Sequence, residues 1–500
     1  MTAKIDPKKT DRTMMSAPTL MHECLGRRLE APRAGLIRQT VEMIVLLCLC
    51  VVLVRTFSAE AYVVPTGSMA PTLLGQHREL TCDNCRFVYV VGIEEDGHTG
   101  QAVCPNCGRR AYEDTPSIEC GGDRVLVQKF LYDFRRPKRW EVAVFHFPGE
   151  PTQAYVKRVV GLPGDSIRIA GGDIYVAGQI VRKTLPEIRA MRMLIHDSRF
   201  EPQDSGRFPR WQFRTGTRDG PLESGWTQGD GTFTHAAVNR DARRHVDWLV
   251  YRHLDPSRGQ YGPVRDFYGY NGGDLHADNE VADVGMDAKL RVSNSVESIS
   301  VSLRSGTDQF LVRIPVGKSR PIQLLQNNAR KSLTNCRNPL ENNNLWPRTI
   351  LLEAAVFDRR VQVAIDRQPL FDPFDFDAPI SVGNFSDSPI ALGVRGGELE
   401  VRELRIYRDI YYTSSLAYTP RHPHGLSTAV RLGPDEYFVL GDNSPVSNDS
   451  RFWNDGPVVR GSMFLGRPFL VHLPGQVVPL KVFGRSVCWV PDPRQIRYIR

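Results

Sequence analysis

A serine in a tight turn is the first residue of this 500-residue chain whose setting suits chemistry. Ser68 follows Gly67 in the segment PTGSMAPTL, directly after the apolar residues 62–64. Glycine lets the backbone approach a bound molecule closely and leaves the next amide free to point at it. A serine hydroxyl becomes an effective nucleophile only where a base takes its proton. Ser68 is therefore a candidate nucleophile that needs a base from elsewhere in the chain.

Lys157 is the best candidate for that base. No histidine lies in a recognisable triad pattern, and a lysine can accept a proton where burial lowers its pKa. Alternation along a strand-like segment puts Tyr155, Lys157 and Val159 on one face. Arg158 then points to the other face, where we expect it to stay solvated. Taken alone, the pattern also fits a solvent-facing lysine, just as Ser68 also fits ordinary turn chemistry.

A polar loop near the C-terminal end could hold such a pair in place. Residues 441–453, GDNSPVSNDSRFW, contain two carboxylates, two amides, three serines and an arginine. Asp449 and Arg451 are close enough in sequence to form an ion pair that stiffens the loop, and Ser447 could then orient an amine. The composition predicts a hydrogen-bonded site, with a solvated loop as the alternative.

Four cysteines form a candidate site of a different kind. Cys82-x-x-Cys85 and Cys104-x-x-Cys107 are separated by eighteen residues. This spacing lies within the range of tetrahedral zinc sites with four thiolate ligands. Disulfides are the alternative, because exported proteins meet oxidising conditions. We favour one structural zinc ion that takes no part in catalysis.

Taken together, these segments resemble the sequence boxes of bacterial type I signal peptidases, also called leader peptidases. The boxes occur in the family's order, and with the strands that join them they cover about 150 residues, less than a third of the chain. The last box departs from the common family pattern at Ser444-Pro445-Val446. The matching segments are the serine box 62–73, the next box 122–130 with 136–145, the lysine box 155–165 and the last box 441–451.

The resemblance implies a serine endopeptidase that removes N-terminal signal peptides from exported preproteins. Ser68 would be the nucleophile, and Lys157 would be the general base that later protonates the leaving amine. The Ser68 amide and the Thr66 hydroxyl would form the oxyanion hole. The substrate would be extended, would pair with a strand edge, and would carry small residues at the first and third positions before the cut. Catalysis would need no cofactor.

The resemblance also implies supporting roles around this pair. Ser447 would hold the lysine amine. Asp442, Asp449 and Arg451 would support the loop, and Met69 would help to seat the domain on the bilayer. Two rival functions remain: a self-cleaving regulator of the LexA type, which shares the dyad, and a catalytically idle surface protein that binds carbohydrate.

An apolar segment near the N-terminus predicts a membrane anchor. The charge-free run 43–54 is shorter than the roughly 20 residues that a spanning helix needs, and the extension back to Leu36 admits Arg38 and Glu42, which can pair on one helix face. We expect the anchor to cover residues 36–56. Basic residues before this segment predict a cytoplasmic N-terminus and a catalytic domain on the exported side of the inner membrane. Membrane lipid and the export translocon are the partners that this topology implies. A cleaved signal sequence ending at Ala59-Glu60-Ala61 is the alternative.

The remaining pattern predicts a mainly β protein, because alternating apolar residues are separated by glycine- and proline-containing turns. We expect a signal-peptidase-type β domain with two insertions, one like a zinc ribbon and one like a jelly-roll β-sandwich of the concanavalin or laminin-G type. The expected segments are a basic tail 1–35, the anchor 36–56, a catalytic domain made of 57–79, 121–184 and 426–485, a zinc-ribbon-like insertion 80–120, a sandwich insertion 185–425 and a tail 486–500.

Composition excludes some classes of protein. Hydrophobic residues make up 41% and charged residues 24%, so the chain is neither broadly disordered nor polytopic. The net charge of +8 is weak over 500 residues and gives no reason to propose nucleic-acid binding. The insertion 185–425 could bind carbohydrate or a protein, or act as a spacer, and no ligand residue can be assigned in it. Deletion of about residues 195–415 is accordingly expected to leave cleavage largely intact.

Overall fold

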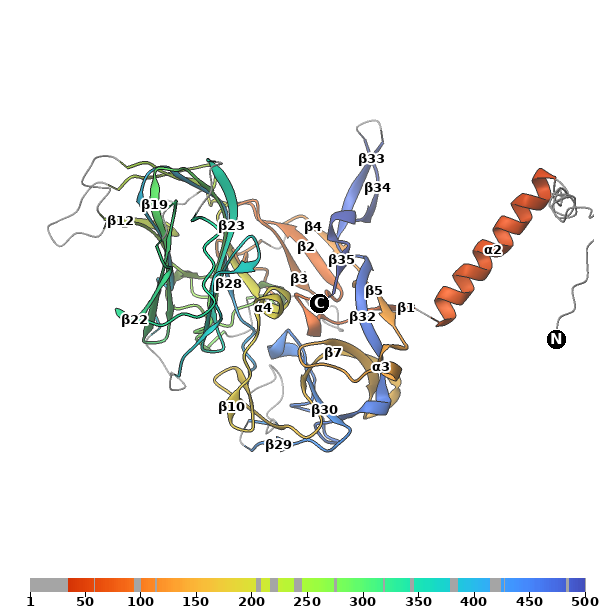
Figure 1. Cartoon of the computed structure of the whole chain (residues 1–500). Helices are drawn as coiled ribbons and strands as arrows, with labels where there is room; N and C mark the ends of the chain where they lie inside the picture. The colour runs from red at the N-terminus through yellow and green to blue at the C-terminus, as the bar shows by residue number, and fades with distance from the viewer. Residues whose placement is uncertain are drawn as a thin grey trace, which may run out of the picture. The chain divides into compact units, whose positions relative to one another are not determined.

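The computed structural model divides into two units, residues 1–58 and 59–500, which are described separately below (Figure 1). The predicted basic tail lies outside the described residues except for Gly35. The side chains of residues 36, 52–57 and 480–489 are also not described. The structure describes the whole chain except residues 1–34, 58, 94–99, 113–114, 204–207, 216–223, 238–244, 274–276, 318–319, 342–345, 378–384, 414–423, 427, 483–484 and 500.

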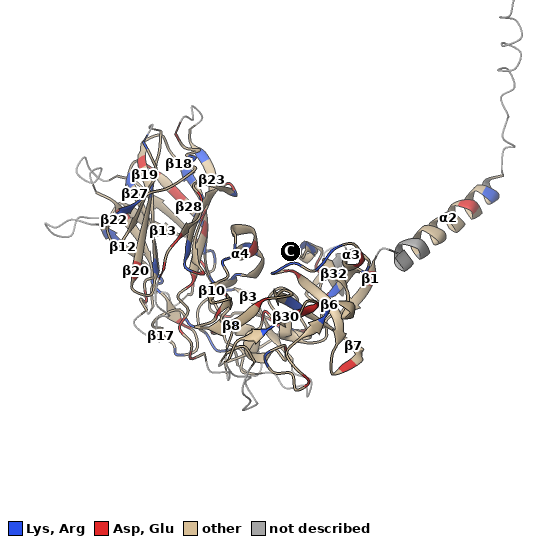
Figure 2. Ribbon diagram, turned by 60° about the horizontal axis from the view of Figure 1, so that its bottom comes forward, with Lys and Arg blue, Asp and Glu red and all other residues tan. Residues whose placement is uncertain are grey.

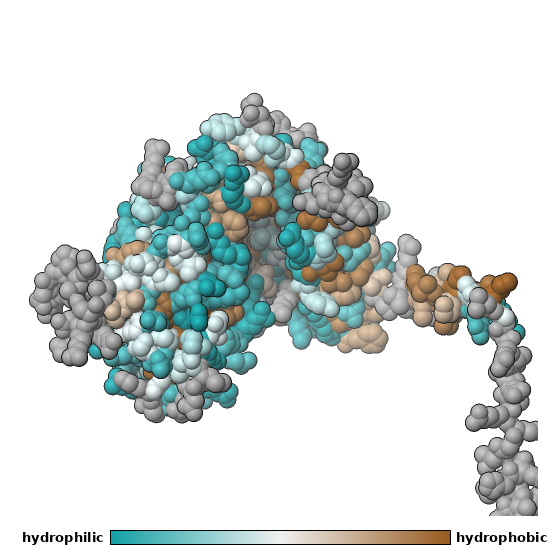
Figure 3. All heavy atoms as spheres, turned by 90° about the horizontal axis from the view of Figure 1, so that it is seen from above, coloured by the Kyte–Doolittle hydropathy of each residue, from teal (hydrophilic) through white to brown (hydrophobic). Residues whose placement is uncertain are grey.

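In the described part of the first unit, residues 36–57 form the helix α2 (Leu36–Phe57). Its described side chains are exposed, and most of them are apolar (Figure 3). Arg38 and Glu42 form an ion pair of 2.8 Å near its start, as their spacing predicts. Figure 2 shows basic and acidic positions along α2 in blue and red. Among the residues that the structure describes, no helix is long and apolar enough to cross a membrane. The anchor at 36–56 stays a prediction.

The second unit contains an eight-stranded antiparallel sheet that draws its strands from both sides of the long segment 185–425. Its order is β1-β5-β32-β6-β7-β30-β31, and β35 pairs with β32. β5 and β32 therefore lie side by side although more than 300 residues separate them in sequence (Figure 1). The strands are β1 (Glu60–Val63), β5 (Arg124–Gln128), β6 (Val142–Phe147), β7 (Glu150–Gly161), β30 (Glu436–Leu440), β31 (Val459–Arg460), β32 (Phe464–Leu473) and β35 (Arg497–Tyr498).

Smaller sheets surround this one. A four-stranded sheet has the order β10-β9-β8-β29, a three-stranded sheet has the order β3-β2-β4, and the hairpins β16–β17 and β33–β34 stand alone. The β33–β34 hairpin projects away from the neighbouring strands in Figure 1. The strands are β2 (His77–Thr81), β3 (Val88–Gly92), β4 (Ser117–Cys120), β8 (Ser166–Ala170), β9 (Asp173–Val176), β10 (Gln179–Ile180), β16 (Leu254–Asp255), β17 (Gln260–Tyr261), β29 (Val430–Arg431), β33 (Val477–Val482) and β34 (Arg485–Pro491).

Two larger antiparallel sheets share one hydrophobic core, and we call residues 193–408, which contain them, the two-sheet region. Leu290 and Leu352 of the first sheet and Val301 and Val312 of the second are all fully buried in that core. The alternating apolar residues predicted from the sequence give each sheet one apolar face, and these two faces pack against each other.

The first sheet of this region has nine strands, and the second has seven. The first contains β11 (Met193–Asp197), β13 (Trp226–Gly229), β14 (Thr232–His235), β18 (Val284–Val292), β23 (Arg348–Phe357), β24 (Arg360–Ile365), β25 (Gln368–Pro369), β26 (Phe374–Asp375) and β28 (Leu399–Arg408). The second contains β12 (Trp211–Thr215), β15 (Asp247–Tyr251), β19 (Val296–Ser305), β20 (Asp308–Pro315), β21 (Gln323–Gln326), β22 (Ala329–Lys331) and β27 (Ile390–Gly396).

Short helices connect these sheets. The helix α4 (Leu185–Met191) enters the two-sheet region, and a capping box between Thr184 and Glu187 satisfies amides at its start. Just before it, Lys183 is buried and its Nζ lies 2.6 Å from Asp358 and 2.8 Å from Asp409. The other helices are α3 (Leu131–Phe134) and the 3₁₀ turns η1 (Gly67–Met69), η3 (Gly269–Asn271), η4 (Ser444–Val446), η5 (Gly461–Met463) and η6 (Pro493–Gln495).

Candidate active site

Ser68 lies in the 3₁₀ turn η1, which follows β1 after a short extended segment. The turn is closed by a hydrogen bond from the amide of Ala70 to the carbonyl of Gly67, 3.0 Å long. Ser68 is 8% exposed. A Cβ atom at Gly67 would clash with the ring of Tyr270, so the residue before the serine must be glycine. The turn therefore holds the hydroxyl at a site that is nearly closed to water.

Lys157 lies on β7, and its Nζ donates a hydrogen bond of 2.7 Å to the Oγ of Ser68. Its side chain is only 4% exposed. Burial lowers the pKa of Lys157 to about 8, an effect that outweighs the opposing influence of Asp449 and Asp442. The two candidates named from the sequence are thus in direct contact, and the amine can lose its proton near neutral pH.

The hydroxyl of Thr66 also lies next to the nucleophile. Its Oγ1 donates to the Oγ of Ser68 over 3.4 Å, and the side chain is half-buried. A hydroxyl in this position can donate to an oxygen that develops negative charge beside Ser68. The geometry is compatible with the oxyanion role that the sequence predicts for Thr66.

Arg158 differs from its prediction. It is fully buried instead of solvated, and its Nε and Nη2 donate to the two carboxylate oxygens of Asp442 over 2.7 and 2.6 Å. Thr72 donates to the same carboxylate over 2.5 Å. The alternation argument failed because the end of β7 is covered on both faces, from Lys157 to Gly161. Through Asp442, this bidentate pair links β7, which carries Lys157, to the polar loop and to Thr72.

The polar loop is stiffened as its composition suggested. Arg451 pairs with Asp449 over 2.9 Å, and both are fully buried. The same guanidinium donates to the hydroxyl of Ser444 over 2.8 Å and to the carbonyl of Thr413 over 2.7 Å. Asp449 in turn accepts the amide of Gly441 over 3.0 Å. Ser444 therefore contributes to the loop even though it departs from the family pattern.

Two predicted contacts are not formed. The Oγ of Ser447 is buried and makes no hydrogen bond to any described residue, so it does not hold the amine of Lys157 in this structure. It packs against the Cα of Gly441 instead, where a Cβ would clash with it. Met69 is fully buried in a core cluster with Val64. The prediction that Met69 contacts the bilayer is therefore wrong for this structure, because its side chain serves the core.

Asn443 was included in the last box but was given no role. Its amide donates to the carbonyl of Ser68, and its side-chain Nδ2 donates to the carbonyl of Gly67, each over 3.1 Å. Asn271, from the predicted insertion 185–425, bonds to the Asn443 side chain. No local pattern could reveal these contacts, because the partners are at least 172 residues apart.

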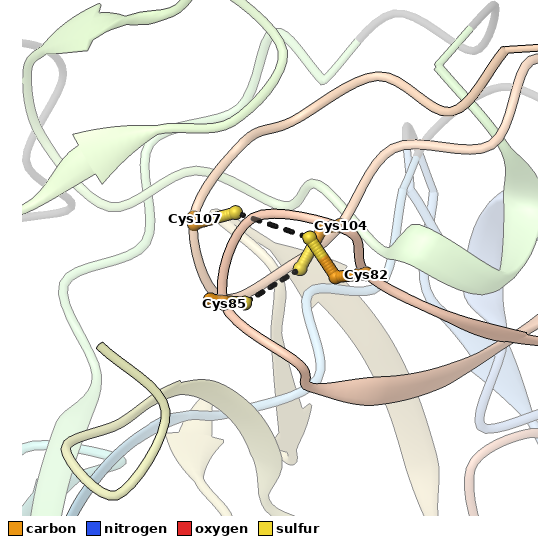
Figure 4. A group of neighbouring side chains, drawn as sticks. All are labelled: Cys82, Cys85, Cys104 and Cys107. Atoms are coloured by element: carbon orange, nitrogen blue, oxygen red, sulfur yellow. Dashed lines mark hydrogen bonds between the residues drawn. The ribbon is translucent and has the colours of Figure 1, made fainter. Parts of the chain in front are cut away.

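The four cysteines converge at one point, and all are buried (Figure 4). The sulfur atoms of Cys82 and Cys107 lie 3.5 Å apart, and those of Cys85 and Cys104 lie 3.6 Å apart. A disulfide requires about 2.05 Å, so the cysteines are not paired in this way. Zinc–sulfur bonds of about 2.3 Å in a tetrahedron would place the sulfurs about 3.8 Å apart, which is close to the spacing found.

Part of the sequence matches a known protein family. Residues 111–217 and 398–473 match the family model described as signal peptidase, peptidase S26. The matched segments contain Lys157, Asp442 and Arg451, whereas Ser68 lies outside them. The contact between Ser68 and Lys157 therefore comes from the structure and not from this match.

Similar sequences carry the same description. The chain is 41% identical over 83 residues to signal peptidase I of Pseudomonas aeruginosa, covering 14% of this chain and 29% of that protein. It is 38% identical over 72 residues to signal peptidase I of Leptolyngbya laminosa, covering 13% of this chain and 34% of that protein. The chain thus spans about a third of the length of the curated relatives that it matches.

One solved structure illustrates the limits of structural similarity. A carbohydrate-binding module, CBM66, from Bacillus subtilis is 9% identical and covers 39% of this chain and 93% of that chain, with a TM-score of 0.24. A TM-score this low supports no conclusion about the two-sheet region.

Proposed function

We propose that this protein is a serine endopeptidase that removes signal peptides from exported preproteins. The observation that carries the proposal is the 2.7 Å hydrogen bond between Ser68 and Lys157, made by a lysine that is buried. A buried amine with a lowered pKa is the form of lysine that can act as a base. The peptidase S26 match and the signal peptidase I relatives support the choice of substrate.

In the first half of the proposed reaction, the neutral amine of Lys157 takes the hydroxyl proton of Ser68. The Oγ of Ser68 then attacks the carbonyl carbon of the peptide bond, and the carbonyl oxygen becomes an oxyanion. The Thr66 hydroxyl and the Ser68 amide donate to that oxygen. As the C–N bond breaks, the ammonium of Lys157 returns the proton to the leaving amine, which departs as the new N-terminus of the mature protein.

In the second half, an ester links Ser68 to the signal peptide. Lys157, neutral again, takes a proton from a water molecule, and the hydroxide attacks the ester carbonyl. The C–O bond breaks, the proton returns to Oγ, and the signal peptide leaves with a new carboxylate. One lysine therefore acts as base and acid in each half. Asp449, Arg451 and Asp442 keep the surrounding loop rigid.

The cysteine segment, residues 80–120, would hold one structural zinc ion through Cys82, Cys85, Cys104 and Cys107. Four thiolates would fill its coordination shell, so the ion would have no open position for substrate. Its contribution would be folding energy, because such metal sites couple binding to folding.

The proposed substrate and the predicted anchor are consistent with one another. An anchor at 36–56, with the N-terminus in the cytoplasm, would hold the catalytic unit at the outer face of the inner membrane, close to lipid and to the export translocon. Preproteins emerge at that surface with their signal peptides still in the bilayer. No described contact favours carbohydrate as a ligand of the two-sheet region.

The test of the function is cleavage of a purified preprotein. Ser68→Ala and Lys157→Met should each abolish cleavage while the circular dichroism and melting temperature of the protein stay near those of the parent. Lys129→Ala is the matched control, because Lys129 forms only a surface ion pair with Glu60 at 3.0 Å. Near-parental cleavage by Lys157→Met would exclude the dyad, and an inactive parent protein would exclude the substrate class.

A further inference from the structure

One segment of the two-sheet region lies directly against the turn that carries Ser68. This segment contains the 3₁₀ turn η3, and its Tyr270 fills the space beside Gly67, where a Cβ would clash with the tyrosine ring. The Tyr270 hydroxyl donates to the carbonyl of Gln76 over 3.1 Å. The ring is buried. The far side of the nucleophile turn is therefore formed by a residue from outside the sequence boxes.

The next residue, Asn271, extends this contact through hydrogen bonds. Its Nδ2 donates to the Oδ1 of Asn443 over 2.8 Å, and the Nδ2 of Asn443 donates to its Oδ1 over 2.6 Å. This reciprocal pair fixes which end of the Asn443 amide faces each neighbour. The Nδ2 of Asn443 can then donate to the carbonyl of Gly67, 3.1 Å away. If the Asn443 amide were rotated by 180°, its Oδ1 would face the carbonyl oxygen of Gly67.

The opposite side of η3 rests on the cysteine segment. The amide of Gly273 donates to the carbonyl of Gln101 over 2.7 Å. A Cβ at Gly269 would lie 3.2 Å from Pro105, within the second C-x-x-C motif. The segment is therefore packed between the cysteine site and the nucleophile turn, and neither side leaves it free to move away.

We propose that Asn271 and Tyr270 are positioning residues for the peptidase reaction. They hold the Gly67-Ser68 turn at the angle that keeps the Ser68 hydroxyl on the amine of Lys157. Asn271 acts through the Asn443 amide, and Tyr270 acts by supporting the turn from behind. Neither residue is assigned contact with the substrate. The proposal rests on the proposed peptidase function, and it adds that the two-sheet region completes the catalytic site.

The kinetic test compares Asn271→Ala, Asn443→Ala and the double variant with the parent protein. Each single variant should lower kcat about tenfold, the value of one well-placed hydrogen bond, and should change KM less than twofold. The double variant should be no slower than Asn443→Ala alone, because both changes break the same chain of contacts. Asn294→Ala, an exposed asparagine in another turn of the two-sheet region, is the control.

The Tyr270 test separates the ring from the hydroxyl. Tyr270→Phe keeps the ring beside Gly67 and should retain at least a third of the parental kcat, whereas Tyr270→Ala should lose more than tenfold. Amide hydrogen exchange should become faster in Tyr270→Ala and Asn271→Ala, with the change concentrated in residues 66–72 and little change in the two-sheet core. Tyr270→Ala should also lower the melting temperature, because it removes a buried ring. The exchange readout does not depend on catalysis.

The outcomes distinguish the two proposals. If the parent protein does not cleave preproteins, or Ser68→Ala still does, the proposed function is wrong. If the parent cleaves and Ser68→Ala is dead, but Asn271→Ala and Tyr270→Ala match the parent in kcat and in exchange at residues 66–72, the positioning role is wrong. A rise in KM alone would also overturn it, since that would indicate contact with the substrate.

Discussion

The chemistry at Lys157 depends on its position near the covered end of β7. Residues at the start of that strand are exposed, whereas those from Lys157 onward are buried. The distinctive boxes pointed to Ser68 and Lys157, and the structure places these two side chains in contact. The sequence could not show that Arg158 is buried beside Lys157, since the alternation rule assumes one solvated face and this strand end has none.

The pH dependence of cleavage should report the buried amine. Because burial lowers the pKa of Lys157 to about 8, the neutral base is lost as the pH falls below that value. We expect kcat/KM to rise with pH through about 8 and then to level off. Lys157→Arg should be inactive throughout, because a guanidinium stays protonated. A rise centred near pH 6.5, the ordinary pKa of histidine, would point to a histidine base instead.

The Arg158–Asp442 pair allows a stability prediction. Asp442→Asn leaves the guanidinium of Arg158 fully buried without its counter-charge. Breaking a buried pair in this way costs about 3–5 kcal/mol of unfolding free energy. Urea unfolding of the protein should show this loss, whereas Lys129→Ala, which breaks an exposed pair, should cost less than about 1 kcal/mol. Equal midpoints for the two variants would contradict the structural role of the pair.

At the scale of elements, local signals predicted the strands and the meeting of the two C-x-x-C motifs. The C-x-x-C spacing correctly indicated that four sulfurs would meet, because each knuckle fixes two of them locally. The spacing could not predict how the two C-x-x-C motifs contact the two-sheet region. Asn106, between two of the cysteines, accepts the amide of Asp197 and donates to the carbonyl of Phe200, each over 2.8 Å. These hydrogen bonds join residues that are 91 and 94 positions apart, so no local sequence pattern predicts them.

Metal removal should therefore loosen more than the cysteine segment. We expect about one zinc ion per chain by elemental analysis, and a strong chelator should lower the melting temperature by several degrees. Faster hydrogen exchange should appear in residues 197–203 as well as in 80–120. Cys336→Ser, which changes an exposed cysteine away from the cluster, should leave the metal content unchanged. Absence of metal together with two mapped disulfides would refute the zinc site.

At the scale of the whole molecule, the structure changes what is expected of the long insertion. The sequence placed residues 185–425 outside the catalytic domain, because their texture differs and no box falls within them. The structure brings Tyr270, Asn271 and Thr413 into contact with the nucleophile turn or with the polar loop. A change in amino-acid composition along the chain shows where a segment begins and ends. It does not show which residues the folded segment contacts.

Deletion of residues 195–415 is consequently expected to reduce cleavage, contrary to the prediction from sequence. The deletion removes both the amide pair to Asn443 and the carbonyl that Arg451 binds. We expect kcat/KM at least tenfold below that of the parent, measured on a deletion protein whose circular dichroism shows intact strands. A well-folded deletion protein with parental activity would restore the view of the insertion as a spacer.

The discontinuous sheet has a consequence for the order of events during synthesis. β6 and β7 leave the ribosome together and can pair at once, but Asp442 follows Arg158 by 284 residues. At about 5–20 residues per second, Lys157 waits for tens of seconds before the strand and loop that bury it exist. Until then we expect its amine to be solvated and protonated, so Ser68 would have no base. On the proposed function, we expect the chain to gain peptidase activity only when the last strands close the sheet.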